Sequence, residues 1–349
     1  MFRVVLIEHG YASIDVERRI IADAGGELID ADKLPFEKAL ESCRDADAVL
    51  FRRIEVPAEM IRQFRKCQII VRYGVGTDNV DVKAATNAKI MVGHVAVYCV
   101  DEVSSHAIAL LLACARNIVG IHKRVEQGSW NVHRHEPIHR MAGKTVGIVG
   151  LGNIGRAVAR KLSGWGLRLL ATDPFVDPEQ AREAGVEVVD FETLCRHSHF
   201  ITLHCPLLPE TRHLIDAKSV QLMQPGTIII NTARGGVIDS RALLGAIDSG
   251  HIAAAGVDVF EEEPLPADSP LRTHPRIVVT DHAAWYSEQS QQELQRIAAE
   301  ELARVCRGGL PRSLANPEVI QRLGREAEWQ PGDNMRWQIK RLRALGLWT

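Results

Sequence analysis

Three side chains capable of binding or proton transfer follow apolar runs in the second half of the chain: Arg234 in NTARGGVID, Glu263 in GVDVFEEEP and His282 in TDHAAW. An arginine beside two glycines can present its planar fork in a cleft, where it suits bidentate binding of a carboxylate. A histidine titrates in the range needed for acid–base chemistry near neutral pH, and a buried glutamate beside it would favour the imidazolium and orient the ring. This combination suits reduction of a 2-oxo acid by a hydride donor.

Each of these residues also has a structural explanation when it is taken singly. Arg234 could form a salt bridge at the end of a strand, and Glu263 could be a solvated charge within a run of three glutamates. Spacing alone does not establish that the three side chains converge.

The stretch from Lys144 to Asp173 indicates which hydride donor would be used. A β-branched run at Thr145–Val149 precedes the glycine turn, a helical pattern follows from Arg156 to Trp165, and a second apolar run ends at Asp173. The turn reads Gly150-Leu151-Gly152-Asn153-Ile154-Gly155. Strand, glycine turn, helix, strand and acid in this order are typical of a dinucleotide site.

The three glycines of this turn have separate predicted tasks. Gly150 permits the tight turn, Gly152 lets the backbone approach a pyrophosphate at the helix N-terminus, and Gly155 allows close packing of helix and strand. Asp173 would accept hydrogen bonds from a ribose and repel a 2′-phosphate, and no arginine follows it in Pro174-Phe175-Val176, so NAD is preferred over NADP. The alternative is a structural glycine turn that binds no nucleotide.

Strand candidates continue after this motif, alternating with helical patterns, and predict a doubly wound sheet of the dinucleotide-binding type. They are Val186–Val189, Phe200–His204, Thr227–Asn231, Ala253–Val259 and Ile277–Thr280. Sites in such sheets lie at the carboxyl ends of the strands. The residues at those ends are Asp173, His204-Cys205-Pro206, Thr232-Ala233-Arg234, Asp258 and His282.

The first hundred residues predict an α/β unit of their own, with strand candidates at Val4–Ile7, Ala48–Phe51, Ile69–Val71 and Ile90–Val92. A long helix capped by Asp101 and ending at Gly128 would join the two units, and a helix at Gln289–Val305 could cross back to the first. We therefore expect an α/β fold of two doubly wound parallel-sheet domains. A Rossmann NAD-binding domain (101–289) would be inserted in a flavodoxin-like substrate domain (1–100 plus 290–349). Three tryptophans in the tail, Trp329, Trp337 and Trp348, indicate that this tail packs on its own or a neighbouring subunit.

Composition narrows the function classes. Lys and Arg number 42 against 44 Asp and Glu, giving a net charge of −2, so we expect neither a nucleic-acid partner nor a membrane surface. The seven cysteines are scattered without a C-x-x-C pair, which is typical of reduced thiols in the cytoplasm. Neither a signal peptide nor an apolar helix long enough to span a bilayer is predicted.

Several histidines outside the main motifs are candidate metal ligands. His133, His135 and His139 share one loop, but no cysteine or paired carboxylate completes a ligand set, so a surface or subunit-contact loop is favoured and no metal is expected. His106, on the joining helix, is expected to be a packed, hydrogen-bonded histidine.

From about Val49 to Pro317 the chain resembles the D-isomer-specific 2-hydroxyacid dehydrogenases. IIVRYGVGTDNVD resembles the family's substrate loop, VGIVGLGNIG its nucleotide motif and HCPLLPETRHLID its mid-domain signature. NTARGGVID and GVDVFEEEP resemble its arginine and glutamate motifs. DHAAWYSEQS is most similar to the histidine segment of the C-terminal-binding-protein subgroup.

The resemblance implies roles for individual residues. His282 would protonate the carbonyl oxygen as hydride moves to C2, with Glu263 favouring its protonated form, and Arg234 would bind the carboxylate and carbonyl oxygens. The other implied substrate contacts are the backbone N–H groups of Val75 and Gly76, with Arg72 nearby, and Trp285, which would suit an apolar or thioether side chain. The implied cofactor contacts are the glycine turn with Asn153 and Ile154, Asp173, His204, Cys205, Pro206, Thr211, Thr232, Ala233 and Asp258, the last facing the nicotinamide carboxamide. A homodimer through the nucleotide-binding domain is also implied.

Departures from the family pattern qualify these expectations. Asp281 stands in place of the usual proline before the histidine, and His94 and Ala96 replace an asparagine and a proline. Phe51 stands where phosphoglycerate-type relatives carry an arginine. The function expected is an NAD-dependent D-2-hydroxyacid dehydrogenase. The alternatives are a member specific for phosphoglycerate, hydroxypyruvate or glyoxylate, and a non-enzymatic NAD(H)-sensing dimeric scaffold of the corepressor type, which the intact Arg234–Glu263–His282 set disfavours.

Overall fold

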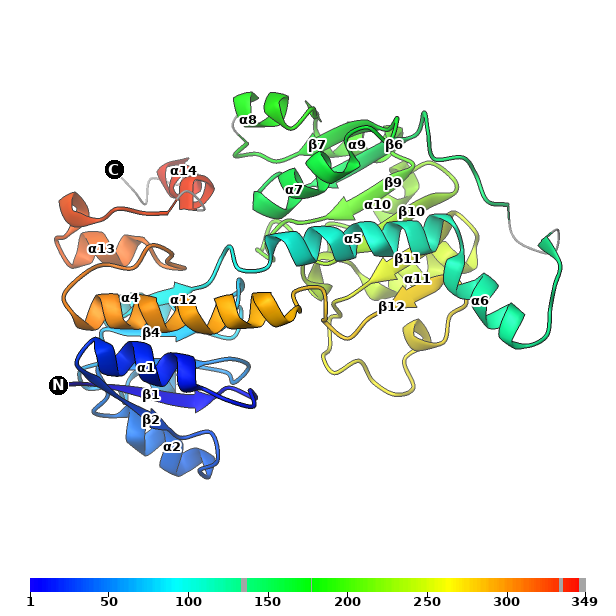
Figure 1. Ribbon diagram of the computed structural model, residues 1–349. Helices are drawn as coiled ribbons and strands as arrows, with labels where there is room; N and C mark the ends of the chain where they lie inside the picture. Colours follow the sequence, from blue (N-terminus) through cyan, green and yellow to red (C-terminus); the bar gives the residue numbers. More distant parts are fainter. Residues whose placement is uncertain (133–136, 177, 333–334, 345–349) are drawn as a thin grey trace. The chain divides into compact units, whose positions relative to one another are not determined.

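The computed structural model describes residues 1–132, 137–176, 178–332 and 335–344 (Figure 1). The chain divides into two compact units, Met1–Tyr98 with Ser287–Thr349 and Cys99–Tyr286. The first unit is therefore built from both ends of the chain. Both units carry parallel sheets, so the predicted α/β fold with two doubly wound sheets is confirmed.

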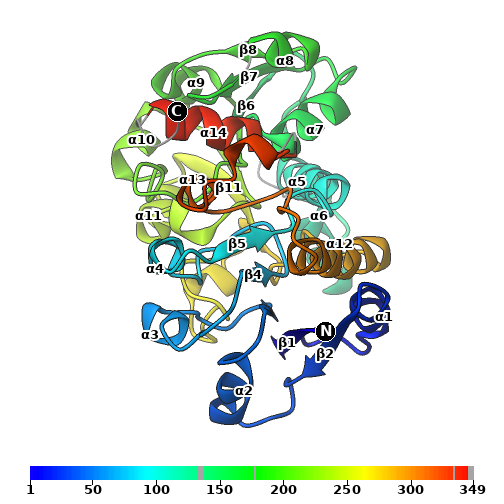
Figure 2. The same cartoon turned by 90° about the vertical axis from the view of Figure 1, so that its left-hand side faces the viewer.

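The first unit has a five-stranded parallel sheet of order β2-β1-β3-β4-β5, the flavodoxin-like order. Its strands are β1 (Phe2–Glu8), β2 (Gly26–Asp30), β3 (Ala48–Phe51), β4 (Ile69–Arg72) and β5 (Met91–His94). Its helices are α1 (Asp15–Asp23), α2 (Phe36–Cys43), α3 (Ala58–Ile61), α4 (Val82–Asn87), α12 (Glu288–Cys306), α13 (Glu318–Arg322) and α14 (Arg336–Ala344). Helices α1 and α12 lie side by side on one face of the sheet, and α2, α3 and α4 cover the other (Figure 2).

The tail belongs to this first unit and packs on it. The indole N–H of Trp329 donates to Pro311 O at 2.7 Å, and Leu314 forms an antiparallel bridge with Gly93 of β5. The segment before the tail thus covers the sheet edge that β5 would otherwise expose. Trp329 is buried, in accord with the expectation that the tail is not freely solvated, whereas Trp348 lies outside the described residues.

The second unit has a seven-stranded parallel sheet of order β12-β11-β10-β9-β6-β7-β8. Its strands are β6 (Thr145–Val149), β7 (Arg168–Thr172), β8 (Glu187–Val188), β9 (Phe200–Leu203), β10 (Thr227–Asn231), β11 (Ile252–Val257) and β12 (Ile277–Val279). Its helices are α5 (Val100–Ala115), α6 (Ile118–Glu126), α7 (Asn153–Leu162), α8 (Pro178–Glu183), α9 (Phe191–His197), α10 (Ala217–Leu222) and α11 (Ser240–Asp248). The strand order reverses between β6 and β9, the switch point of the dinucleotide-binding fold.

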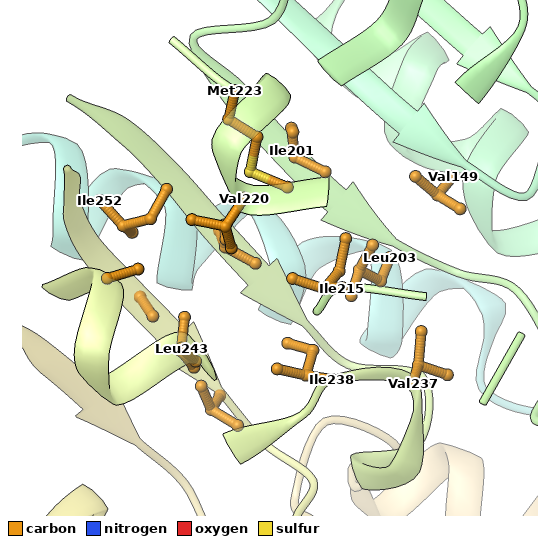
Figure 3. Packing of buried hydrophobic residues seen from close by; sticks show 14 of the residues in the cluster. Val149, Ile201, Leu203, Ile215, Val220, Met223, Val237, Ile238, Leu243 and Ile252 are labelled. Carbon is orange, nitrogen blue, oxygen red and sulfur yellow. The ribbon is translucent and has the colours of Figure 1, made fainter. Parts of the chain in front are cut away.

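Two hydrophobic layers sandwich this second sheet. Residues of α5, α7 and α8 pack on one face with Ile148 and Ile230. Helices α9, α10 and α11 pack on the other face, where Ile201, Leu203 and Ile215 meet Val220 and Leu243 (Figure 3). Because both faces are covered, the central strands are continuous apolar runs, which made them recognisable in the sequence.

The structure corrects the single long helix expected from Asp101 to Gly128. Two helices, α5 and α6, replace it, and they meet at Asn117, whose φ of 48° is left-handed and ends α5. Helix α5 is capped at Cys99 rather than at Asp101. No single helix among the described residues could span a bilayer; α5 and α6 pass the length and composition test only as a pair bent by 61°.

Candidate active site

Glu263 and His282 form a hydrogen-bonded pair in the second unit. Nδ1 of His282 lies 2.7 Å from Oε2 of Glu263, and the other carboxylate oxygen accepts the N–H of Phe260 at 2.9 Å. An ionised carboxylate can only accept, so Nδ1 carries the proton of this bond. Nε2, the far nitrogen of the ring, is left to exchange a proton with a substrate, and the His282 side chain is 39% exposed.

The surroundings of Glu263 keep it ionised. Burial by itself would raise its pKa, but the hydrogen bond and charge of His282, the Phe260 N–H and the charge of Arg234 outweigh burial and lower the pKa of Glu263. Arg234, Glu263 and His282 are therefore electrostatically coupled in the folded unit.

The turn carrying Arg234 is held against the loop carrying Glu263. The side chain of Asn231, at the end of β10, accepts the N–H of Ala233 at 3.0 Å and donates to Arg234 O at 2.9 Å. A Cβ on Gly235 would lie 1.8 Å from the carbonyl carbon of Phe260. Only glycine permits this backbone approach, which explains the glycine next to Arg234.

His282 has a left-handed backbone with φ of 60°, an uncommon conformation for a residue with a Cβ. Asp258 holds it there. The carbonyl of Asp258 accepts the N–H of His282 at 2.9 Å, and its carboxylate accepts the N–H groups of Ala283 and Ala284 at 2.9 and 3.1 Å. Asp258 is 1% exposed. Sequence reasoning placed Asp258 against the nicotinamide and missed this work of holding the catalytic segment.

The glycine turn before α7 has the shape required for a dinucleotide. Gly150 has φ of 89°, and a Cβ there would lie 2.7 Å from Cys205 N. A Cβ on Gly155 would lie 2.1 Å from Gly150 O, so helix and turn are in contact. Nothing lies within 4 Å of a Cβ built on Gly152, which caps α7 without a side-chain hydrogen bond. The helix N-terminus is thus open to an anion.

Asp173 lies beside this turn at the end of β7. Its Oδ2 accepts the N–H of Leu151 and its Oδ1 that of Phe175, both at 2.9 Å. Each oxygen keeps a lone pair for a ribose hydroxyl. Oδ1 of Asn153 accepts a hydrogen bond from the guanidinium of Arg156 at 2.8 Å, and Ile154 packs on the hydrophobic core. These two residues therefore shape the turn.

Two buried polar atoms fit a bound cofactor. Oγ1 of Thr232 and Nδ1 of His204 are buried and have no hydrogen-bond partner within the described part of the chain. Burial lowers the pKa of His204 to about 3, so its ring is neutral. Unpartnered buried polar atoms are costly, and a ligand that bonds to them would relieve that cost. The neighbouring Thr211 donates to Pro206 O at 2.6 Å and so shapes the turn that carries Cys205.

The loop predicted to bind the substrate carboxylate follows β4 in the first unit. Nδ1 of His94 donates to Val75 O at 2.7 Å, and burial lowers the pKa of His94 to about 4, so this histidine is a neutral anchor. Arg72 donates through Nε to Arg52 O at 3.0 Å. The loop that contains Val75 and Gly76 is therefore fixed by its own unit.

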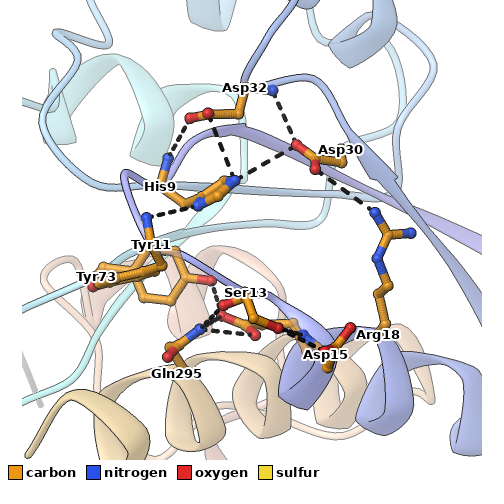
Figure 4. A network of polar contacts seen from close by, with 10 residues as sticks. His9, Tyr11, Ser13, Asp15, Arg18, Asp30, Asp32, Tyr73 and Gln295 are labelled. Atoms are coloured by element: carbon orange, nitrogen blue, oxygen red, sulfur yellow. Dashed lines mark hydrogen bonds and ion pairs between the residues drawn. The ribbon is translucent and has the colours of Figure 1, made fainter. Parts of the chain in front are cut away.

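A polar network that sequence reasoning missed lies beside this loop (Figure 4). The hydroxyl of Tyr73 donates to the fully buried Glu17 at 2.5 Å, and Gln295 of α12 donates to the two carboxylate oxygens at 3.0 and 3.2 Å. Glu17 and Ile21 lie four residues apart on the buried side of α1. A charge on that apolar stripe was the signal available in the sequence.

Trp285 and the loop histidines are the remaining predicted sites. The ring of Trp285 packs edge-on to Tyr286 with centroids 5.5 Å apart, directly after the catalytic segment. His133 and His135 lie outside the described residues, and His139 is exposed. The described residues contain no group of three or more His, Cys, Asp or Glu side chains that could hold a metal ion.

Comparison with known proteins identifies the family. Residues 108–284 match the model of the D-isomer specific 2-hydroxyacid dehydrogenase NAD-binding domain. The chain belongs to the D-isomer specific 2-hydroxyacid dehydrogenase family. NAD binding is thereby confirmed as predicted, and the relatives are oxidoreductases of 2-hydroxy acids, the enzyme class predicted for this chain.

Individual relatives agree with this assignment. The chain is 39% identical to the D-3-phosphoglycerate dehydrogenase of Methanocaldococcus jannaschii over 86% of its length but spans only 58% of that protein. It is 38% identical to the glyoxylate reductase of Korarchaeum cryptofilum, with 81% of this chain and 86% of that protein covered. The crystal structure of a glyoxylate reductase from Paecilomyes thermophila has a TM-score of 0.83 at 28% identity, covering 91% of this chain and 98% of that one. Nothing here favours the scaffold alternative.

Proposed function

We propose that this protein reduces a small 2-oxo acid to the corresponding D-2-hydroxy acid with NADH. The observation that carries the proposal is the 2.7 Å hydrogen bond between Glu263 and His282, coupled to the charge of Arg234. A proton donor, its orienting carboxylate and a cation for the substrate's carboxylate are the groups that this reduction needs besides the hydride source.

The work of each residue follows from its chemistry. Arg234 binds the carboxylate of the substrate and polarises the C2 carbonyl, whose oxygen becomes negative as the bond order falls. Nε2 of His282 gives its proton to that oxygen, and the ionised Glu263 stabilises the ring while it is protonated. The bound nicotinamide supplies the hydride that C2 receives. In the reverse direction His282 accepts the hydroxyl proton.

Features of the second unit would hold the cofactor. The open N-terminus of α7 at Gly152 receives the pyrophosphate, and Asp173 accepts hydrogen bonds from the adenosine ribose. Thr232 and His204 offer buried atoms for the nicotinamide half. The roles of Arg72, Val75 and Gly76 in carboxylate binding rest on the family resemblance, as does an apolar contact from Trp285.

The relatives support a small 2-oxo acid as the substrate. Glyoxylate and hydroxypyruvate are the first acids to test, because the chain spans most of a glyoxylate reductase to which it is 38% identical. Larger apolar 2-oxo acids are the second group, because Trp285 follows the catalytic segment. The finer resemblance to the C-terminal-binding-protein subgroup stays a prediction.

The protein is proposed to be a cytoplasmic homodimer. All seven cysteines are free thiols, six of them buried. Helix α6 has no buried residue, and Ile118 and Val125 on it are 53% and 45% exposed, as are Trp130 and Val132 after it at 89% and 72%. Burial of these apolar side chains by a second copy would remove them from water. Light scattering of the wild type and of Trp130→Asp with Val132→Asp tests this: the wild type should be a dimer and the variant a monomer.

NADH oxidation with a panel of 2-oxo acids tests the activity. The panel comprises glyoxylate, hydroxypyruvate, pyruvate, 2-oxobutyrate, 4-methylthio-2-oxobutyrate and phenylpyruvate. His282→Ala should lower kcat by about a thousandfold, since a positioned acid–base group contributes roughly 10²- to 10⁴-fold. Its affinity for NADH should remain. Tight NADH binding without turnover of any acid would favour the non-enzymatic scaffold.

A further inference from the structure

The catalytic segment has a second support that neither the motifs nor the proposed mechanism uses. Thr280, immediately after β12, donates its hydroxyl to Oδ1 of Asp258 at 2.5 Å. Nε2 of His106 on α5 lies 3.0 Å from the same hydroxyl and 3.7 Å from Asp258 Oδ1. His106, Thr280 and the buried Asp258 therefore form a continuous chain of polar contacts within one unit.

The donor and acceptor capacities of the three side chains determine the direction of these hydrogen bonds. Asp258 as a carboxylate only accepts, so the single hydroxyl proton of Thr280 goes to it. The oxygen of Thr280 must then accept from His106, whose Nε2 carries the proton. Hydrogen bonds that run in one direction polarise one another and strengthen the terminal bond to the carboxylate.

Asp258 is where this chain meets the chemistry. Its carboxylate also accepts the N–H groups of Ala283 and Ala284, the two residues after His282, and its carbonyl accepts the N–H of His282. His282 is held at φ of 60°, a conformation that persists only where the surroundings impose it. Any freedom of the Asp258 side chain would pass directly to the backbone that follows His282.

We propose that His106 and Thr280 are positioning residues for the reaction: they fix the Asp258 carboxylate, which in turn fixes the backbone of the segment carrying His282. His106 reaches this chain from α5, far from His282 in the sequence, and its side chain is 25% exposed. The effect on kcat rests on the proposed function, whereas the restraint on the backbone of Ala283 and Ala284 does not.

Paired variants separate the hydrogen bonds from side-chain volume. Thr280→Val removes the hydroxyl and keeps the shape, while Thr280→Ser keeps the hydroxyl. His106→Phe removes the donor, while His106→Gln places an amide N–H close to the position of Nε2. Thr273→Val, at an exposed position before β12, is the matched control.

The first readout is hydrogen exchange of the Ala283 and Ala284 amides in the intact protein. Exchange should quicken about tenfold in Thr280→Val and in His106→Phe, because the carboxylate that accepts from these amides is less restrained. Thr280→Ser and His106→Gln should recover most of the protection, and Thr273→Val should leave it unchanged. Wild-type exchange rates in both the Val and the Phe variants would overturn the proposal, as would loss of protection in the Ser and Gln variants equal to that in Val and Phe.

The second readout is the split between kcat and KM. Thr280→Val and His106→Phe should lower kcat about tenfold and leave KM for the 2-oxo acid within about twofold, because Arg234 is untouched. A rise in the KM for the 2-oxo acid, of the same size as the expected fall in kcat and with kcat unchanged, would contradict a role in positioning His282. If the wild type turned over no 2-oxo acid, the proposed function would fail, and the exchange rates would still decide this inference.

Discussion

Oε2 of Glu263 lies 2.7 Å from Nδ1 of His282, so the carboxylate orients the ring and determines which ring nitrogen carries the proton of this bond. The pKa of Glu263 is lowered, although burial opposes this, by the hydrogen bond and charge of His282, the Phe260 N–H and the charge of Arg234. The pair is thus charged on the Glu263 side throughout the neutral range.

Glu263→Gln should lower kcat at neutral pH roughly tenfold. The amide can keep a hydrogen bond to Nδ1 and so still orient the ring, but it supplies no negative charge beside His282 while the ring exchanges a proton with the substrate. Initial rates of NADH oxidation measure this, and a kcat equal to that of the wild type would show that the charge of the carboxylate does not contribute to the reaction.

The same pair should contribute to stability above, but not below, the pH range in which Glu263 titrates. A carboxyl whose folded pKa is depressed stabilises the fold above its unfolded pKa, about 4.3, and this stability is lost as the pH falls through the folded pKa. The difference in free energy of unfolding between the wild type and Glu263→Gln should therefore shrink between about pH 5 and pH 3. Urea titrations at several pH values measure it, and a constant difference would contradict the depressed pKa.

Asp173→Asn should relax the preference for NADH over NADPH. The side chain keeps an acceptor beside Leu151, while the charge that repels a 2′-phosphate is removed. We expect NADH affinity to fall and the ratio of kcat/KM for NADPH to that for NADH to rise at least tenfold. Asp190→Asn, at the exposed cap of α9, is the control and should leave this ratio unchanged.

Two tyrosines of the first unit offer a matched pair for stability. Tyr73→Phe removes a hydroxyl that donates to the buried Glu17, and should cost about 1–3 kcal/mol because a buried carboxyl oxygen loses a donor. The hydroxyl of Tyr11 is buried and has no partner among the described residues, so Tyr11→Phe should be neutral or stabilising. Chemical denaturation gives the free energy of unfolding of both variants. Equal destabilisation would show that the hydrogen bond from Tyr73 to Glu17 stabilises the fold no more than the unpartnered hydroxyl of Tyr11 does.

Trp285→Ala should change the ranking of 2-oxo acids. Its ring follows the catalytic segment and packs on Tyr286, so its loss should lower kcat/KM for phenylpyruvate and 4-methylthio-2-oxobutyrate more than for glyoxylate. The substrate panel described above provides the comparison. An unchanged ranking would mean that Trp285 does not line the substrate's side-chain pocket.

Much of the architecture could be predicted from the sequence, because its signals are local. Buried parallel strands are continuous apolar runs, and β10 was expected with the bounds that the structure gives it. The glycine turn was recognisable because the tight turn and the close helix packing leave no room for a Cβ at Gly150 and Gly155. Helix α2 and strand β2 were missed, since both are short and carry mixed polarity. The long helix was predicted wrongly because the left-handed residue Asn117 that divides it has no obligatory signature.

Local sequence patterns were sufficient to predict the fold class, the cofactor type and the three candidate catalytic residues. The side chains that support those three residues became apparent from the folded chain. Glu17 and Tyr73 are 56 residues apart in the sequence and form a hydrogen bond. His106 contacts Thr280, which is 174 residues away, and Asp258, which is 152 residues away (258 − 106). No local pattern records such contacts, because they arise where helices and strands from distant parts of the chain pack together and bury polar groups that must then find one another.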